Sequence, residues 1–414
     1  MCDPIFTLDH SPKSEPHPVI QDALTPHQLF RTLLIINLNV FGVGLGIGFM
    51  FPLISIVLES QGVSSTVIGI NHALGALAIL MVGPFVPLII QKFGAARVIL
   101  AGLFSIAGLI TFMPQTDSVL VWCVLRFAWG AVLAGPWISS ETLMNLLVPE
   151  KSRGRWLATY GMMMCLGLAI GPQVLQFVGT AGSRPFYIAS GLLVIAAIPI
   201  FWCPALKGIE SDVRPGAWLR TFSFAPLAMF CGFYTGLVDT GVLGLLPVYG
   251  MERGLSETQA VWALTWYLIG QTVLIPLLGW MLDHFRPTTI YRLIAIVAAS
   301  AALSVATIIH LPWQLAFCVF LWGGVNGVAY SAGLTNLGRV FSPRRLAAAN
   351  TTFVIFFNMG SATGPIIAGI GMDLSKHWGL PVAMALPALI LGLITLIFPQ
   401  LPSDRSGITK SERI

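Results

Sequence analysis

The sequence predicts an all-α membrane protein in which twelve transmembrane helices form two six-helix bundles related by a pseudo-twofold axis. Three observations predict this fold: an apolar composition, an internal repeat and an uneven distribution of positive charge. Of the 414 residues, 56% are hydrophobic and only 9% are charged, whereas about a quarter of the residues in a soluble domain are charged. The solvent for most of this chain must therefore be lipid.

The internal repeat consists of two motifs that each occur twice, with the same spacing between the copies. A Gly-x-x-x-Gly-Pro motif at 167–172 recurs at 360–365, and a Phe-x-Trp-Gly-x-Val motif at 127–132 recurs at 320–325. Both pairs are offset by 193 residues (360 − 167 and 320 − 127). A constant offset of this length, in a chain this apolar, indicates two homologous membrane halves.

The spans follow from length, because a helix needs about 20 apolar residues to cross the hydrocarbon core. The chain contains twelve such segments, with cores at 32–57, 66–90, 95–114, 118–147, 156–179, 185–204, 224–249, 258–282, 289–309, 313–338, 346–371 and 380–399. We therefore expect five regions in order: a tail at 1–29, a first bundle at 30–204, a linker at 205–223, a second bundle at 224–400 and a tail at 401–414.

Positive charge sets the expected orientation. The even-numbered loops and the two tails hold 18 lysines and arginines, and the odd-numbered loops hold three, which are Arg184, Arg253 and Lys376. By the positive-inside rule both termini are expected in the cytoplasm. The same clustering accounts for the net charge of +5, so we expect no nucleic-acid partner.

Several function classes lack their signatures. The chain has no Walker A motif and no metal-spaced cysteine or histidine cluster, so no cofactor and no metal are expected. Ser139, Ser140 and Glu141 lie on one helical turn, but no histidine stands near them in the pattern. We therefore do not expect an enzyme.

Only three charged residues lie well inside the predicted spans, and each costs about 2.5–3.5 kcal/mol at a helix centre. Asp239 has no cation in its own span, so it either pairs across the halves, binds protons or hydrogen-bonds a neighbouring helix. Glu141 either binds protons or closes a gate through a salt bridge to Arg97 or Arg153. Arg126 either binds an anionic substrate, modulates a nearby proton site or clasps backbone carbonyls. Fifteen residues separate Arg126 from Glu141, about 22 Å along a helix, so these two cannot pair directly.

Uncharged side chains supply the remaining candidates for a polar cavity. One of them, Trp266, could stack on a lipophilic, cationic or aromatic substrate. Each alone is also compatible with helix–helix contact. The candidates are Asn37, Tyr234, Trp266, Gln271, Asn326 and Asn358.

The loop after the second span reads Pro-x-x-x-Gln-Lys-x-Gly-Ala-Ala-Arg at 87–97, and the loop after the eighth span reads Gly-x-x-x-Asp-His-x-Arg at 279–286. The fourth span carries Arg-x-x-x-Gly at 126–130, and the fifth carries Gly-x-x-x-Gly-Pro at 167–172. These motifs resemble those of the major facilitator superfamily. Glutamine replaces the family's acidic residue in the first of these loops, and the fifth span matches part of a motif associated with antiporters. The resemblance implies gating or conformational roles for Gln91, Lys92, Gly94, Arg97, Asp283, Arg286, Gly167, Gly171, Pro172, Gly364 and Pro365.

The resemblance extends over the whole chain and is nearest to bacterial members grouped with drug/proton antiporters. It implies a secondary transporter of the inner membrane, which exports a small organic molecule against proton entry by alternating access. We expect a monomer, because one chain already holds both halves. Asp239, Glu141 and Arg126 are then the proton-coupling candidates. Two alternatives stay open: a proton symporter or facilitator that imports a sugar, organic acid or other nutrient, and a non-transporting receptor or lipid-handling protein.

Overall fold

The computed structural model describes residues 25–149, 152–203, 225–285, 287–341 and 343–397. The expected linker at 205–223, most of the N-terminal tail and the whole C-terminal tail fall outside the described residues. The first half comprises α1 (Pro26–Ser60), α2 (Ser65–Val82), α3 (Val86–Phe93), α4 (Ala95–Phe112), α5 (Val119–Leu147), α6 (Arg153–Val178) and α7 (Arg184–Ala197). The second half comprises α9 (Pro226–Glu252), α10 (Glu257–His284), α11 (Pro287–Ile308), α12 (Pro312–Val340), α13 (Pro343–Leu374) and α14 (Gly379–Ile397).

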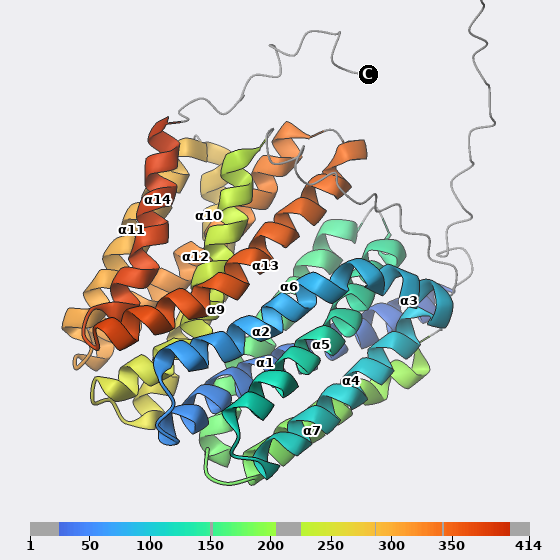
Figure 1. Cartoon of the computed structure of the whole chain (residues 1–414). Helices are drawn as coiled ribbons and strands as arrows, with labels where there is room; N and C mark the ends of the chain where they lie inside the picture. Colours follow the sequence, from blue (N-terminus) through green and yellow to red (C-terminus); the bar gives the residue numbers. More distant parts are fainter. Residues whose placement is uncertain (1–24, 150–151, 204–224, 286, 342, 398–414) are drawn as a thin grey trace, which may run out of the picture.

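The helices confirm the predicted spans. Eleven segments of the described chain are long and apolar enough to cross a membrane, and α10, with 28 residues, occupies the remaining span. The second span is α2 and α3 joined by a short 3-10 turn at Gly83–Phe85. In Figure 1 the helices of the first half, blue to green, and those of the second half, yellow to red, occupy separate sides of the molecule.

Two helices begin with a capping box that local sequence explains. Thr25 precedes α1 and Ser256 precedes α10, and each side chain accepts a hydrogen bond from the backbone of a glutamine three residues on. In turn, the side-chain oxygens of Gln28 and Gln259 accept a hydrogen bond from the backbone N–H of the cap residue. This arrangement satisfies two helix N–H groups that have no partner within the helix. The first helix therefore begins at Pro26, earlier than the apolar core alone indicates.

The repeated Gly-x-x-x-Gly-Pro motif makes the same contact in both halves. Gly167 and Gly171 on α6 lie against the backbone of α1, and Gly360 and Gly364 on α13 lie against the backbone of α9. A methyl group on Gly364 would overlap the carbonyl oxygen of Leu237. Small residues let helix backbones touch in a bilayer, so the sequence repeat corresponds to a repeated packing interface.

The two halves meet along α2 and α13, α6 and α10, and α1 and α9. In Figure 1 α2 and α13 run side by side. Hydrogen bonds between the halves gather at the end of the molecule that carries the α1–α2, α9–α10 and α13–α14 loops. There Gln176 donates to the backbone oxygen of Thr258 at 3.1 Å, and Thr180 donates to Glu257 at 3.1 Å. We call this end the closed end.

Candidate functional site at Asp239

Asp239 lies in the middle of α9 and is the acceptor of a polar cluster. Its Oδ1 accepts hydrogen bonds from Tyr267 Oη at 3.0 Å, Gln271 Nε2 at 2.9 Å and Asn326 Nδ2 at 2.7 Å. Its Oδ2 accepts from Gln271 Nε2 at 3.1 Å. Three neutral donors therefore hold one carboxylate, and within the described chain no lysine or arginine forms an ion pair with it.

Local sequence explains why these donors converge. Tyr267 and Gln271 stand four residues apart on α10, so their side chains lie on one face of that helix. Asn326 follows Gly323 on α12 by three residues. A methyl group on Gly323 would overlap the carbonyl oxygen of Tyr267, so glycine at this position lets α12 approach α10 closely. The glycine of the repeated Phe-x-Trp-Gly motif thus brings Asn326 within reach of Asp239.

The other half of the molecule borders the same region. Cys165 on α6 lies within electrostatic range of Asp239 and close to Thr272 on α10. Tyr330 on α12 lies within electrostatic range of both Asp239 and Glu141. One side chain, Tyr330, therefore lies within electrostatic range of an acid from each half.

Glu141 on α5 is exposed and accepts a hydrogen bond from Trp137 Nε1 at 2.9 Å. No arginine pairs with this carboxylate among the residues that the structure describes. Arg97 is exposed, and the side chain of Arg153 lies outside the described residues. The proton-site interpretation of Glu141 and the gate interpretation both stay predictions.

Arg126 stands apart from both acids. Its side chain is 3% exposed, and its guanidinium lies 4.6 Å from the ring centre of Phe51 and 4.4 Å from that of Trp129. Gly75 makes room for it, since a methyl group there would lie 3.1 Å from Arg126 Cζ. The Nε atom has no hydrogen-bond partner. Stacking between two aromatic rings, rather than an ion pair, therefore holds this cation.

The remaining cavity candidates do not all join Asp239. Tyr234 is fully buried and its hydroxyl has no partner. Asn37 and Asn358 donate to their own helices, to Leu33 O at 2.7 Å and Val354 O at 2.9 Å. Of the six uncharged candidates, only Gln271 and Asn326 donate to the acid.

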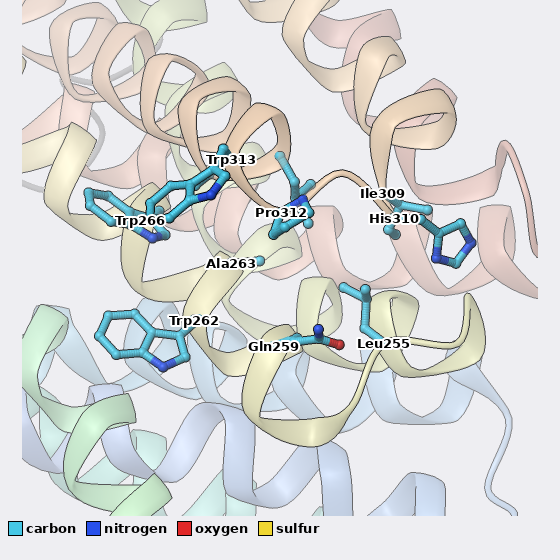
Figure 2. A pocket seen from close by; sticks show the side chains of 11 residues that line it. Leu255, Gln259, Trp262, Ala263, Trp266, Ile309, His310, Pro312 and Trp313 are labelled. Atoms are coloured by element: carbon cyan, nitrogen blue, oxygen red, sulfur yellow. The ribbon is translucent and has the colours of Figure 1, made fainter.

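Trp266 lies in a different place. With Trp262 and Trp313 it lines an apolar pocket of about 220 Å³ between α10 and α12, close to the α11–α12 loop (Figure 2). Trp266 and Tyr267 are consecutive on α10, so their side chains leave the helix in different directions. The structure therefore puts Trp266 in a side pocket, away from the hydrogen bonds of Asp239.

The predicted gating residues in the loop after the second span are solvent-facing. Gln91, Lys92 and Arg97 are exposed, and Lys92 Nζ lies 5.3 Å from the ring centre of Phe93. Gly94 separates α3 from α4 with a φ of 85°, a conformation that favours glycine. In the corresponding loop of the second half, the Asp283 side chain and all of Arg286 lie outside the described residues. Pro172 and Pro365 lie inside α6 and α13.

The sequence interpretation did not assign Tyr267, Cys165 or Tyr330 to the site of Asp239. Tyr267 carried a usable signal, because it stands one helical turn before Gln271 in a span that must face Asp239. Cys165 and Tyr330 carried none, since their relevance depends on how α6 and α12 are placed around the acid.

These features define a multi-pass membrane protein with two homologous six-helix halves and a buried polar cluster around Asp239 in the second half. Comparison with known proteins agrees: the family model of the Major Facilitator Superfamily matches residues 36–256 and 228–414. The chain belongs to this superfamily and is a secondary transporter.

Relatives and solved structures share the fold at low identity. An uncharacterized MFS-type transporter of Bacillus subtilis, YfkF, is 26% identical over 348 residues, covering 82% of this chain and 87% of the relative. Multidrug resistance protein 2 of the same organism is 23% identical over 405 residues, covering 91% and 98%. The crystal structure of the nucleoside transporter NupG matches with a TM-score of 0.71 at 12% identity, covering 90% of this chain and 99% of that one.

Proposed function

We propose that this transporter exports a small organic molecule in exchange for protons, with Asp239 as the principal proton site and Glu141 as a second. The observation that carries the proposal is a carboxylate inside a span that is held by three neutral donors. A buried acid in a membrane helix is costly and marks an ion or substrate pathway. Because no described cation neutralises Asp239, a proton or a positively charged substrate group is left to do so.

Exchange follows from competition for one carboxylate. When Asp239 is ionised, its oxygens accept from Tyr267, Gln271 and Asn326 and attract a cationic group. When it is protonated, that attraction is lost and the substrate is released. Alternating access then couples the two events, since the halves expose the site to one side at a time.

Orientation and assembly complete the proposal. The excess of lysine and arginine in the even-numbered loops supports cytoplasmic termini, so the closed end faces outward. The likeness to Multidrug resistance protein 2 supports export. We place the protein in the bacterial inner membrane as a monomer, since one chain already supplies both halves.

Transport in proteoliposomes tests the proposal. Purified protein is reconstituted with a pH-sensitive dye inside the vesicles, and candidate compounds are chosen by thermal-shift screening of lipophilic cations, organic acids and sugars. We expect movement of a cationic compound in one direction to accompany proton movement in the other. Co-movement of protons and compound in the same direction, or no proton movement at all, would contradict antiport.

A second candidate function is proton-linked import of an organic acid. The buried Arg126 guanidinium, which has no acidic partner within the described chain, favours it. The rings of Phe51 and Trp129 cover this cation, however, which supports a packing role. Thermal-shift binding distinguishes the two functions, because stabilisation by carboxylates that disappears in Arg126→Gln would support the import of an acid.

A further inference from the structure

The helices α2 and α13 come from opposite halves and touch backbone to backbone at the closed end. A methyl group on Gly69 of α2 would overlap the carbonyl oxygen of Pro365. A methyl group on Gly369 of α13 would overlap the carbonyl oxygen of Ser65. Each helix thus offers a glycine to the backbone of the other. This reciprocal crossing leaves no room for a side chain on either side.

One turn beyond this crossing, a carboxylate from α13 caps α2. Asp373 Oδ1 accepts from the backbone N–H of Ser65 at 3.0 Å, and Oδ2 accepts from that of Thr66 at 2.9 Å. The next N–H, of Val67, goes to the local cap residue Ser64 at 3.4 Å. The first turn of an α-helix leaves N–H groups without partners inside the helix. Here the other half of the molecule satisfies two of them.

A second acid of the same half joins this contact. Glu252, the last residue of α9, accepts a hydrogen bond from the Ser65 hydroxyl at 3.3 Å. The charged groups within electrostatic range of Glu252 are Lys376, Asp373 and Glu59. Lys376 is a single cation among three acids. The N-terminus of α2, with its partial positive charge, is therefore a natural counter-charge for Asp373.

We propose that Asp373 is a latch that holds the closed end shut by capping α2 across the two halves. The cap exists only while the halves are together, because Asp373 and Ser65 lie on different bundles. When the halves separate at this end, the Ser65 and Thr66 N–H groups pass to water and the charge–dipole attraction is lost. The latch rests on the proposed alternating-access cycle for the statement that the halves separate at this end.

The test measures the distance between the halves directly. Spin labels are placed on Gln61 and His310, which are exposed, lie at the closed end in opposite halves, and take no part in the latch. The full chain is studied in lipid nanodiscs, without substrate or pH gradient, by double electron–electron resonance. We expect Asp373→Asn to raise the ratio of separated to closed molecules by about fivefold, which corresponds to about 1 kcal/mol at 1.36 kcal/mol per tenfold. That is the usual size of the charge–dipole attraction at a helix N-terminus, which an asparagine side chain lacks.

Asp117 provides the matched control. It is an exposed acid in the α4–α5 loop at the same end, so Asp117→Asn removes the same charge without touching α2. We expect this control to leave the distance distribution unchanged. An equal response of Asp117→Asn and Asp373→Asn would overturn the latch, because the effect would then come from surface charge alone.

A glycine pair gives a second, independent measurement. Gly369→Ala puts a methyl group into the backbone of α2 and should separate the halves more strongly than Asp373→Asn. Gly191→Ala on α7 is its control, since a methyl group there meets nothing within 4 Å. If both Asp373→Asn and Gly369→Ala keep the closed distance, the latch is wrong. The distance measurement does not depend on transport. If the distances shift as expected but the proteoliposome assay detects no proton exchange, the latch is retained and the exporter proposal is wrong.

Discussion

Replacing Asp239 with asparagine separates the charge of the site from its shape. Three of the four contacts to the acid end on Oδ1, so an amide oxygen at that place can still accept from Tyr267, Gln271 and Asn326. The fourth contact, from Gln271 Nε2 to Oδ2 at 3.1 Å, would become donor against donor. The asparagine variant thus loses one hydrogen bond and keeps the volume of the site.

The cost of the change can be worked out from those contacts. One neutral hydrogen bond contributes about 0.5–1.5 kcal/mol, and the three remaining donors fall from charge-assisted to neutral strength. The buried charge also disappears, which offsets part of that loss. We therefore expect thermal unfolding in detergent to stay close to wild type. The amide of the Asp239→Asn variant cannot take up a proton, so accumulation driven by a pH gradient should fall to the level of downhill flux.

The assay compares two fluxes in the same proteoliposomes. One is accumulation of a cationic compound under an imposed pH gradient, and the other is its downhill movement without a gradient. Asp117→Asn again serves as the control, because it removes an exposed acid outside the site. Gradient-driven accumulation at the wild-type level in folded Asp239→Asn protein would refute Asp239 as the proton site.

Three further substitutions test other parts of the structure. Gly364→Ala puts a methyl group into the backbone of α9 and should lower stability by about 1–3 kcal/mol in thermal unfolding, while Gly191→Ala, in open space, should not. Arg126→Lys loses the flat guanidinium that stacks between two rings and should destabilise by about 1 kcal/mol; an unchanged melting temperature would contradict the stacking role. Glu141→Gln keeps an acceptor for Trp137 and should fold normally, but should lower the number of protons exchanged per substrate, and an unchanged ratio would remove Glu141 as a proton site.

The fold was predictable because lipid imposes simple rules. Three features can be read from composition or spacing alone: span length, positive charge in alternate loops and a repeat at 193 residues. None of them requires knowledge of which residues are in contact. The repeat even anticipated packing, since Gly171 and Gly364 both lie against the equivalent helix of their own half. The start of α1 was missed because its capping box lies outside the apolar core.

The site was predictable only in part, because polar residues in a membrane are few but their directions are unknown. Gln271 and Asn326 were found as polar residues in spans that could face a cavity. Trp266 was selected because it could stack on a substrate, yet it lies in the side pocket between α10 and α12. The contact of Asp373 with Ser65 joins residues 308 positions apart, and no local pattern at either position indicates the other.

The hydrogen bonds of Asp239 also constrain how coupling can work. All three donors come from α10 and α12, and the acid comes from α9, so the whole cluster belongs to the second half. When the halves rock against each other, this cluster can move as one unit and keep its donors. What changes is the neighbour on the far side, where α6 presents Cys165. If Asp239 exchanges protons as proposed, we expect that exchange to be controlled by which solution reaches the acid, with the hydrogen bonds around it unchanged in both states.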